Sequence, residues 1–211
     1  MQYTLEQCLE QQKKVDASIK HNGEYNPIRA ARAETVEMQE WLGLIKTWGE
    51  NKIDMKQAFM ELVDTEAFTL SALLLEYCNN IEVISNKLDS HKVLNAEYGI
   101  FENIAKDSDC LADCFSLEGF CGGLFNALML IESICTNHFK RPVADIYHYY
   151  MGKQTLTQFR QKNGYKTGGY IKIWHGREDN EYLTEYLEKG LSVEEIENAL
   201  EIAYSAVVKE S

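Results

Sequence analysis

Two pairs of acidic residues, each with a spacing of three positions, are the features of this sequence best suited to chemistry. Glu34 and Glu37 belong to the segment ETVE, and Glu61 and Asp64 belong to ELVD. Residues three apart on a helix share a face, and each of these faces continues into apolar residues downstream. The sequence therefore predicts four carboxylates at the edge of a helical core.

Four carboxylates in such a place predict a divalent cation. Burying an ionised carboxylate is costly unless the charge is paired, and like charges at close range oppose ionisation. Mg²⁺ takes hard oxygen ligands, and a pair of such ions can clamp the oxygens of a phosphoryl-transfer reaction. The alternative is that the acids lie on the rim and pair with Arg29, Arg32 or Lys56.

Helix start signals recur along the chain, and sustained period-two alternation is absent, so the fold class predicted is all-α. Four start signals stand out: Thr4 with Gln7, Asn26-Pro27, Asp54 with Gln57, and Ser192 with Glu195. The predicted helices span about 4–20, 27–48, 54–79, 91–106, 118–139 and 142–163, with a last one from 192. A short connection makes 27–48 and 54–79 an antiparallel hairpin, on which the four acids converge.

Composition limits the classes of partner. The 211 residues include 33 acidic and 21 basic side chains, a net charge of −12 that argues against a nucleic-acid polymer or an anionic membrane as partner. No apolar run approaches a membrane span, and MQYTLEQCLEQQKK has no signal-peptide block. The six cysteines form no CxxC pair and are typical of reduced thiols. We expect one catalytic domain, 1–211, in the cytoplasm.

Residues 164–180, GYKTGGYIKIWHGREDN, interrupt the helical pattern. A loop of this length without internal structure is usually functional or disordered, and its aromatic residues argue against disorder. The sequence suggests no role for the cationic side chains of Lys166, Lys172 and Arg177 other than binding substrate phosphate. We therefore expect a mobile binding loop that closes over a ligand.

The acidic motifs resemble a known signature. ETVE followed by ELVD is similar to the ExxE…ExxD pattern of the all-α nucleotide pyrophosphatase superfamily, which includes MazG-type enzymes and dimeric dUTPases. The block YYMGKQTLTQFRQKNGYKTGGYIKIWHGREDNEYL at 149–183 is similar to the dimeric-dUTPase block YxGKNxLNxFRQxNGYKxGxYxKxWxGKEDNxxL. The resemblance to dimeric dUTPases covers most of the chain, except roughly residues 82–140.

The resemblance implies a helical bundle of the all-alpha NTP pyrophosphatase type with a helix-loop lid near the C-terminus, within about 142–180. It implies Mg²⁺-dependent hydrolysis of dUTP, and often dUDP, to dUMP, with water attacking the β-phosphate. Glu34, Glu37, Glu61 and Asp64 would be metal ligands, Glu34 and Glu37 catalytic, and Glu37 would orient or deprotonate the water. The implied substrate-binding residues are Gln12, Trp48, Lys153, Arg160, Asn163, Tyr165, Lys166 and Lys172.

The resemblance also implies a homodimer, which the apolar segment Leu124 to Ile134 favours independently. Two alternatives stay open. Val15-Asp16 stands where the family has Asn to read uracil, which leaves a pyrophosphatase acting on dCTP or a modified nucleotide. The other alternative is a non-catalytic helical interaction module, with a structural metal on Cys110, Cys114 and Cys121.

Overall fold

The structure is a computed structural model, and it describes residues 3–18, 25–45, 53–94, 103–115 and 121–210. The chain divides into two compact units: Thr4–Tyr147 forms one, and Met1–Tyr3 with His148–Ser211 forms the other. We describe each unit by itself. The expectation of a single catalytic domain stays a prediction.

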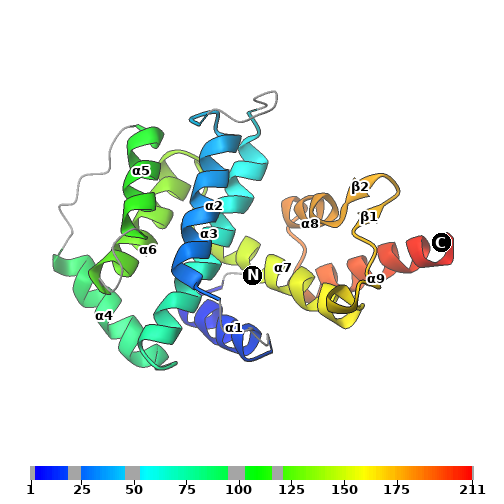
Figure 1. The fold of residues 1–211 in the computed structure, drawn as a ribbon, viewed down its shortest axis with the longest axis horizontal. Helices are drawn as coiled ribbons and strands as arrows, with labels where there is room; N and C mark the ends of the chain where they lie inside the picture. Colours follow the sequence, from blue (N-terminus) through cyan, green and yellow to red (C-terminus); the bar gives the residue numbers. More distant parts are fainter. Residues whose placement is uncertain (1–2, 19–24, 46–52, 95–102, 116–120, 211) are drawn as a thin grey trace. The chain divides into compact units, whose positions relative to one another are not determined.

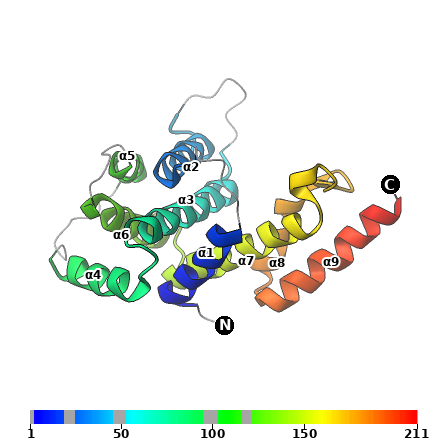
Figure 2. The ribbon, with the colours of Figure 1, turned by 60° about the horizontal axis from the view of Figure 1, so that its bottom comes forward.

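The first unit is a helical bundle around α3, whose side chains are buried almost all round. Figures 1 and 2 show α2 and α3 side by side. Helices α1, α4 and α6 also contact α3. Among the described helices, none is both long and apolar enough to cross a membrane. The helices are α1 (Leu5–Ser18), α2 (Pro27–Trp41), α3 (Met55–Glu76), α4 (Ile81–Leu94), α5 (Ile104–Cys114), α6 (Cys121–Asn137) and the start of α7 (Val143–Lys162).

The second unit contains the rest of α7 and a small hairpin packed on an aromatic core. Trp174 is completely buried, and the rings of Phe159, Tyr170 and Tyr204 lie 5.5–6.4 Å from the Trp174 ring. Antiparallel pairing joins Ile173 to Glu178. The elements after α7 are the 3-10 turn η1 (Tyr165–Thr167), β1 (Ile173–Trp174), β2 (Arg177–Glu178), α8 (Asp179–Glu188) and α9 (Val193–Glu210).

The helix starts predicted at Thr4, Asn26 and Asp54 are confirmed by their side-chain caps. Thr4 and Gln7 bond reciprocally at the start of α1, at 2.9 and 3.3 Å. Asn26 caps α2 and Asp54 caps α3, each by accepting two backbone N–H groups. The all-α prediction is also confirmed, because the described part of the chain is dominated by helices and has only one two-stranded sheet.

Three predicted boundaries are wrong. Helix α2 ends at Trp41, not near 48, because Gly43 takes a left-handed φ of +70° and the Leu44 amide bonds back to Gln39. The predicted helix 91–106 is interrupted at Asn103, whose extended backbone (φ −125°, ψ 114°) caps α5 at Ile104, and residues 95–102 lie outside the described residues. Residues 164–180 are not a loop without structure, because they form η1 and the β1–β2 hairpin.

Candidate active site

Three of the predicted acids come together between α2 and α3. Glu34 on α2 and Glu61 and Asp64 on α3 each offer a carboxylate oxygen, and these oxygens all lie within 4.8 Å of one another. All three residues are half-buried. On α3, Glu61 and Asp64 belong to a half-buried stripe that continues to Phe68, whereas the other residues between Ala58 and Leu74 are buried. Packing of α2 against this stripe therefore assembles the group.

Hydrogen bonds near the C-terminal end of α2 hold this helix against the start of α3 and against α5. The Asp54 backbone N–H donates to the Trp41 carbonyl at 3.0 Å, where the chain enters α3. On the outer side of α2, the buried Gln39 amide donates to Ser108 Oγ at 3.1 Å and to Asp109 Oδ1 at 2.9 Å. Helix α5 thus supports the helix that carries Glu34.

The donor set fits a hard divalent cation. Mg²⁺–oxygen bonds are about 2.0–2.1 Å, so ligand oxygens on opposite sides of the ion lie roughly 4 Å apart. Three carboxylate oxygens within 4.8 Å already approach that spacing. Glu34, Glu61 and Asp64 are thus the residues that would hold a metal ion.

Glu37 lies outside this group. It is exposed, whereas Ala31, Thr35 and Met38 form the buried face of α2, which Glu34 flanks. The expectation that Glu34 and Glu37 both continue an apolar stripe was therefore wrong. The roles of Glu37 as metal ligand and as the residue that activates water stay predictions.

Gln12 belongs to a buried polar network in the same unit. Its Nε2 donates to Asp16 Oδ1 at 2.8 Å, and Asp16 Oδ2 accepts from Ser71 Oγ at 2.9 Å. The Tyr25 hydroxyl donates to Ser71 Oγ at 3.3 Å, and burial raises the pKa of Tyr25. Ser71 lies two turns beyond Asp64 on α3, roughly 10 Å along the helix axis.

The remaining predicted substrate-binding residues lie in the second unit, except Trp48, which is outside the described residues. Lys153 is half-buried on α7. Asn163 Nδ2 donates to the Phe159 carbonyl at 2.9 Å at the end of α7. Tyr165 and Lys166 are exposed on η1. Their contacts with substrate stay predictions.

The cations of segment 164–180 have protein partners. Lys172 Nζ lies 3.1 Å from Glu178 Oε2, and Arg177 pairs with Glu181 and Glu185 at 3.4 and 2.9 Å. The expectation that only phosphate accounts for these two cations was therefore wrong. Closure of this segment over substrate stays a prediction.

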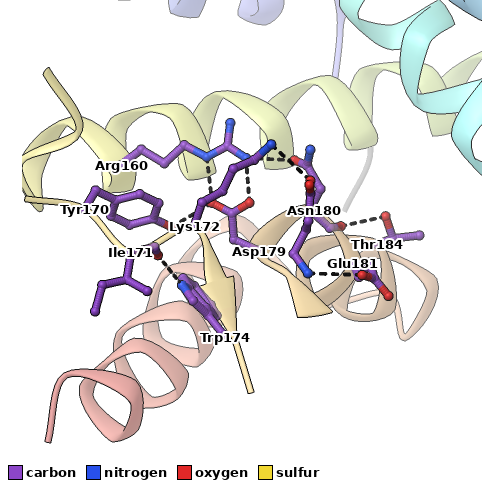
Figure 3. Close-up of polar contacts among 10 residues, drawn as sticks. Arg160, Tyr170, Ile171, Lys172, Trp174, Asp179, Asn180, Glu181 and Thr184 are labelled. Atoms are coloured by element: carbon purple, nitrogen blue, oxygen red, sulfur yellow. Dashed lines mark hydrogen bonds and ion pairs between the residues drawn. The ribbon is translucent and has the colours of Figure 1, made fainter. Parts of the chain in front are cut away.

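Arg160 is bound to a buried acid. Figure 3 shows its guanidinium, on α7, facing Asp179 at the start of α8. Nε and Nη2 donate to the two Asp179 carboxylate oxygens, both at 2.7 Å, and Nη2 also donates to Asn180 Oδ1 at 3.1 Å. Burial lowers the pKa of Arg160, but the bonds and charge of Asp179 outweigh burial and raise it overall.

Sequence reasoning missed three fully buried acids, Asp107, Asp179 and Glu66. Asp179 directly follows the N-cap of α8, so its place beside a helix N-terminus was readable, but its partner lies 19 positions away. The sequence gave no sign that Glu66 is buried, because Glu66 lies in the same acidic segment, ELVDTEAF, as the two predicted ligands. Burial and the nearby Glu132 raise the pKa of Glu66 to about 8, so Glu66 belongs to the core.

Comparison with known proteins identifies the family. A family model described as dUTPase matches residues 4–165, more than half of the chain. The match includes Glu34, Glu61 and Asp64, all of the first unit, and α7, whereas 166–211 lie outside it. No curated protein sequence matches the chain.

Proposed function

The chain belongs to the all-alpha dUTPase family and is a dUTP-hydrolysing enzyme, and from this premise we propose that it is a Mg²⁺-dependent dUTP diphosphatase. Water attacks the β-phosphorus of dUTP, and the bond from that phosphorus to the oxygen bridging to the α-phosphate breaks. The products are dUMP, which keeps the bridging oxygen, and pyrophosphate. We include dUDP as a substrate, with phosphate as the second product.

The observation that supports this proposal is the three-carboxylate group of Glu34, Glu61 and Asp64. A bound divalent cation would supply charge neutralisation at the phosphate oxygens and a more acidic water. The chain's own part is to hold three oxygens at nearly the required spacing before substrate arrives. Such preorganisation avoids reorganisation during the reaction.

Glu37 is suited to a different role from that of its three neighbours. Its carboxylate is exposed, one turn from Glu34 on the same helix. An exposed carboxylate beside the site can accept a proton from the attacking water or orient that water. We therefore assign Glu37 to water activation.

A second substrate class, dCTP or a modified deoxynucleotide, has one observation in its favour. The Asp16 carboxylate, which can only accept hydrogen bonds when ionised, is the centre of the network around Gln12. Hydrolysis rates for dUTP, dUDP, dCTP, dTTP and UTP, with product analysis by chromatography, show which of the two substrate classes the enzyme prefers. Faster hydrolysis of dCTP than of dUTP would reject the primary assignment.

The metal-ligand assignment is tested by Glu61→Gln with Glu76→Gln as matched control. Glu76 is an exposed acid on the same helix, outside the carboxylate group. We expect Glu61→Gln to lose more than about tenfold in kcat/KM at fixed Mg²⁺, with circular dichroism unchanged, and Glu76→Gln to match wild type. Equal activity of Glu61→Gln and wild type, or full activity in EDTA, would refute the assignment.

We also propose that the enzyme is a homodimer in the cytoplasm. The dimer is supported by exposed apolar surface in the first unit, including Ile53 and Met55. The cytoplasm is supported by five cysteines that form no disulfide in the described part of the chain, as is typical of reducing compartments.

A further inference from the structure

Asp179 connects three parts of the second unit through a carboxylate that is completely buried. Its oxygens accept two bonds from Arg160 at the end of α7 and one from the Tyr170 hydroxyl, at 2.7 Å. Its backbone N–H donates to the Lys172 carbonyl at 3.1 Å, next to β1. Figure 3 shows these side chains converging on Asp179.

The donors of Arg160 can be counted against these bonds. A guanidinium has five N–H donors in a rigid plane. Nε uses its one donor on Asp179, and Nη2 uses both of its donors, on Asp179 and Asn180. Among the described residues, Nη1 has no hydrogen-bond partner, and its two N–H groups project from a side chain that keeps 17% of its surface exposed.

This arrangement fixes the direction of the remaining donors. A bidentate pair with a carboxylate holds the guanidinium plane more strictly than a single bond, and the 0% exposure of Asp179 leaves that carboxylate little freedom. The Nη1 edge therefore points in one direction before any ligand arrives. Planar N–H donors of this kind match phosphate oxygens.

We propose that Asp179 is a positioning residue: it orients the Arg160 guanidinium so that the Nη1 edge meets one phosphate oxygen of the nucleotide. This inference rests on the proposed function, because it requires a nucleotide phosphate as ligand. Asp179 lies outside the residues that match the family model. The inference thus gives residues beyond the matched part of the chain a role in substrate binding.

The test measures KM and kcat for dUTP, together with thermal unfolding, in Asp179→Asn and Arg160→Lys. The matched control is Glu201→Gln, which removes the acidic partner of Lys162, an exposed ion pair of 2.7 Å two residues along α7 from Arg160. We expect a KM increase of about tenfold or more in Asp179→Asn, with kcat changed less than about threefold. Glu201→Gln should have the KM of wild type.

The double variant Asp179→Asn/Arg160→Lys shows whether the two residues act as one unit. We expect its KM to exceed that of either single variant by less than about twofold, since each substitution already removes the oriented Nη1 edge. If Asp179→Asn does not fold, Arg160→Lys decides, because lysine keeps the charge but lacks the planar fork.

Two outcomes would overturn the inference. One is a folded Asp179→Asn protein whose KM stays within about twofold of wild type, since a purely structural pair lowers only the unfolding temperature. The other is a normal KM in Arg160→Lys. Wild type in the same assay separates the two proposals, because an inactive wild type refutes the proposed function, whereas an active one with unchanged variants refutes only the role of Asp179.

Discussion

Glu34 and Glu37 carry the same side chain one turn apart on α2, but their surroundings differ. Glu34 flanks the buried face that packs on α3 and joins Glu61 and Asp64, whereas Glu37 is exposed. A half-buried carboxylate among like charges is suited to holding a cation, and an exposed one is suited to exchanging protons with water. The two residues therefore need separate tests.

We predict that Glu37→Gln abolishes Mg²⁺-dependent hydrolysis and leaves the fold intact. Loss of an exposed charge has little effect on stability, whereas loss of the group that activates water should reduce kcat by more than about tenfold. Turnover and circular dichroism measured together check this, with Glu34→Gln as comparison. Activity of Glu37→Gln above about a tenth of wild type would contradict the assignment.

The type and spacing of residues were enough to predict that Glu61 and Asp64 share one face of α3, because the i, i+3 rule depends only on local helix geometry. They could not separate Glu37 from Glu34, since the face that packs inward depends on where α3 and α5 lie. They also could not pair Arg160 with Asp179, because that contact depends on how the β1–β2 hairpin returns the chain to α7.

At the scale of elements, caps were the most predictable feature. Ser192 and Glu195 form a reciprocal cap at the start of α9, with the Ser192 N–H donating to Glu195 Oε2 at 2.7 Å. This backbone bond, the largest cause, lowers the pKa of Glu195 from its usual 4.5. A carboxyl group with a lowered folded-state pKa stabilises the fold above its unfolded value, and this stabilisation is lost as pH falls through the folded value.

We therefore predict that the unfolding temperature of Glu195→Gln is lower than that of wild type near about pH 6, and that the difference disappears toward about pH 3. The amide keeps an acceptor but loses the charge. Thermal melts across this range check the prediction, with Glu194→Gln on the same helical turn as control. A difference that persists at the acid end would mean that the amide fails as a cap regardless of charge.

The contact between α7 and α8 gives a second prediction for an element. A Cβ on Gly152 would lie 2.7 Å from Leu187 Cδ2, and both residues are buried. Overpacking of this kind costs typically about 1–3 kcal/mol, and the better helix propensity of alanine offsets about 1 kcal/mol. We expect Gly152→Ala to lower the free energy of unfolding, as measured by urea denaturation.

The matched background is Leu187→Ala, in which the clash is absent. There the same Gly152→Ala substitution should be neutral or stabilising, because only the propensity effect remains. Equal destabilisation in both backgrounds would show that Leu187 adjusts without cost.

The segment 164–180 was wrongly predicted to lack structure of its own, whereas its mobility without ligand stays a prediction. Its aromatic residues explain the structure that it forms. Tyr170 stacks on Tyr204 with a ring separation of 5.1 Å, and Trp174 Nε1 donates to the Ile171 carbonyl at 2.7 Å. Glycines at 164, 168 and 176 take positive φ and permit the turns. A pattern of residues shows that such a segment is anchored, but not which side chains pair its cations.

At the scale of the whole chain, the distribution of apolar surface differs from the sequence expectation. Leu124, Phe125, Leu128, Ile131 and Ile134 are all buried within the chain's own core. These residues, which favoured a dimer in the sequence analysis, are therefore buried by packing within the chain. Among the described residues, the exposed apolar side chains include Leu44, Ile53 and Met55, where α2 ends and α3 begins, and Leu75 and Ile202 on other surfaces.

We predict that the enzyme is a homodimer and that Leu44, Ile53 and Met55 contribute to its interface. Ile53 is 68% exposed, and gathered apolar surface of this kind typically marks an interaction site. Light scattering at micromolar concentration should give twice the 24.3 kDa mass of one chain. Ile53→Glu should shift the protein toward monomer, because a dimer would then bury a charge.

Ile202→Glu, on the exposed side of α9, is the matched control and should stay dimeric. A wild-type monomer would refute the dimer, and a monomeric Ile202→Glu with a dimeric Ile53→Glu would move the interface to α9.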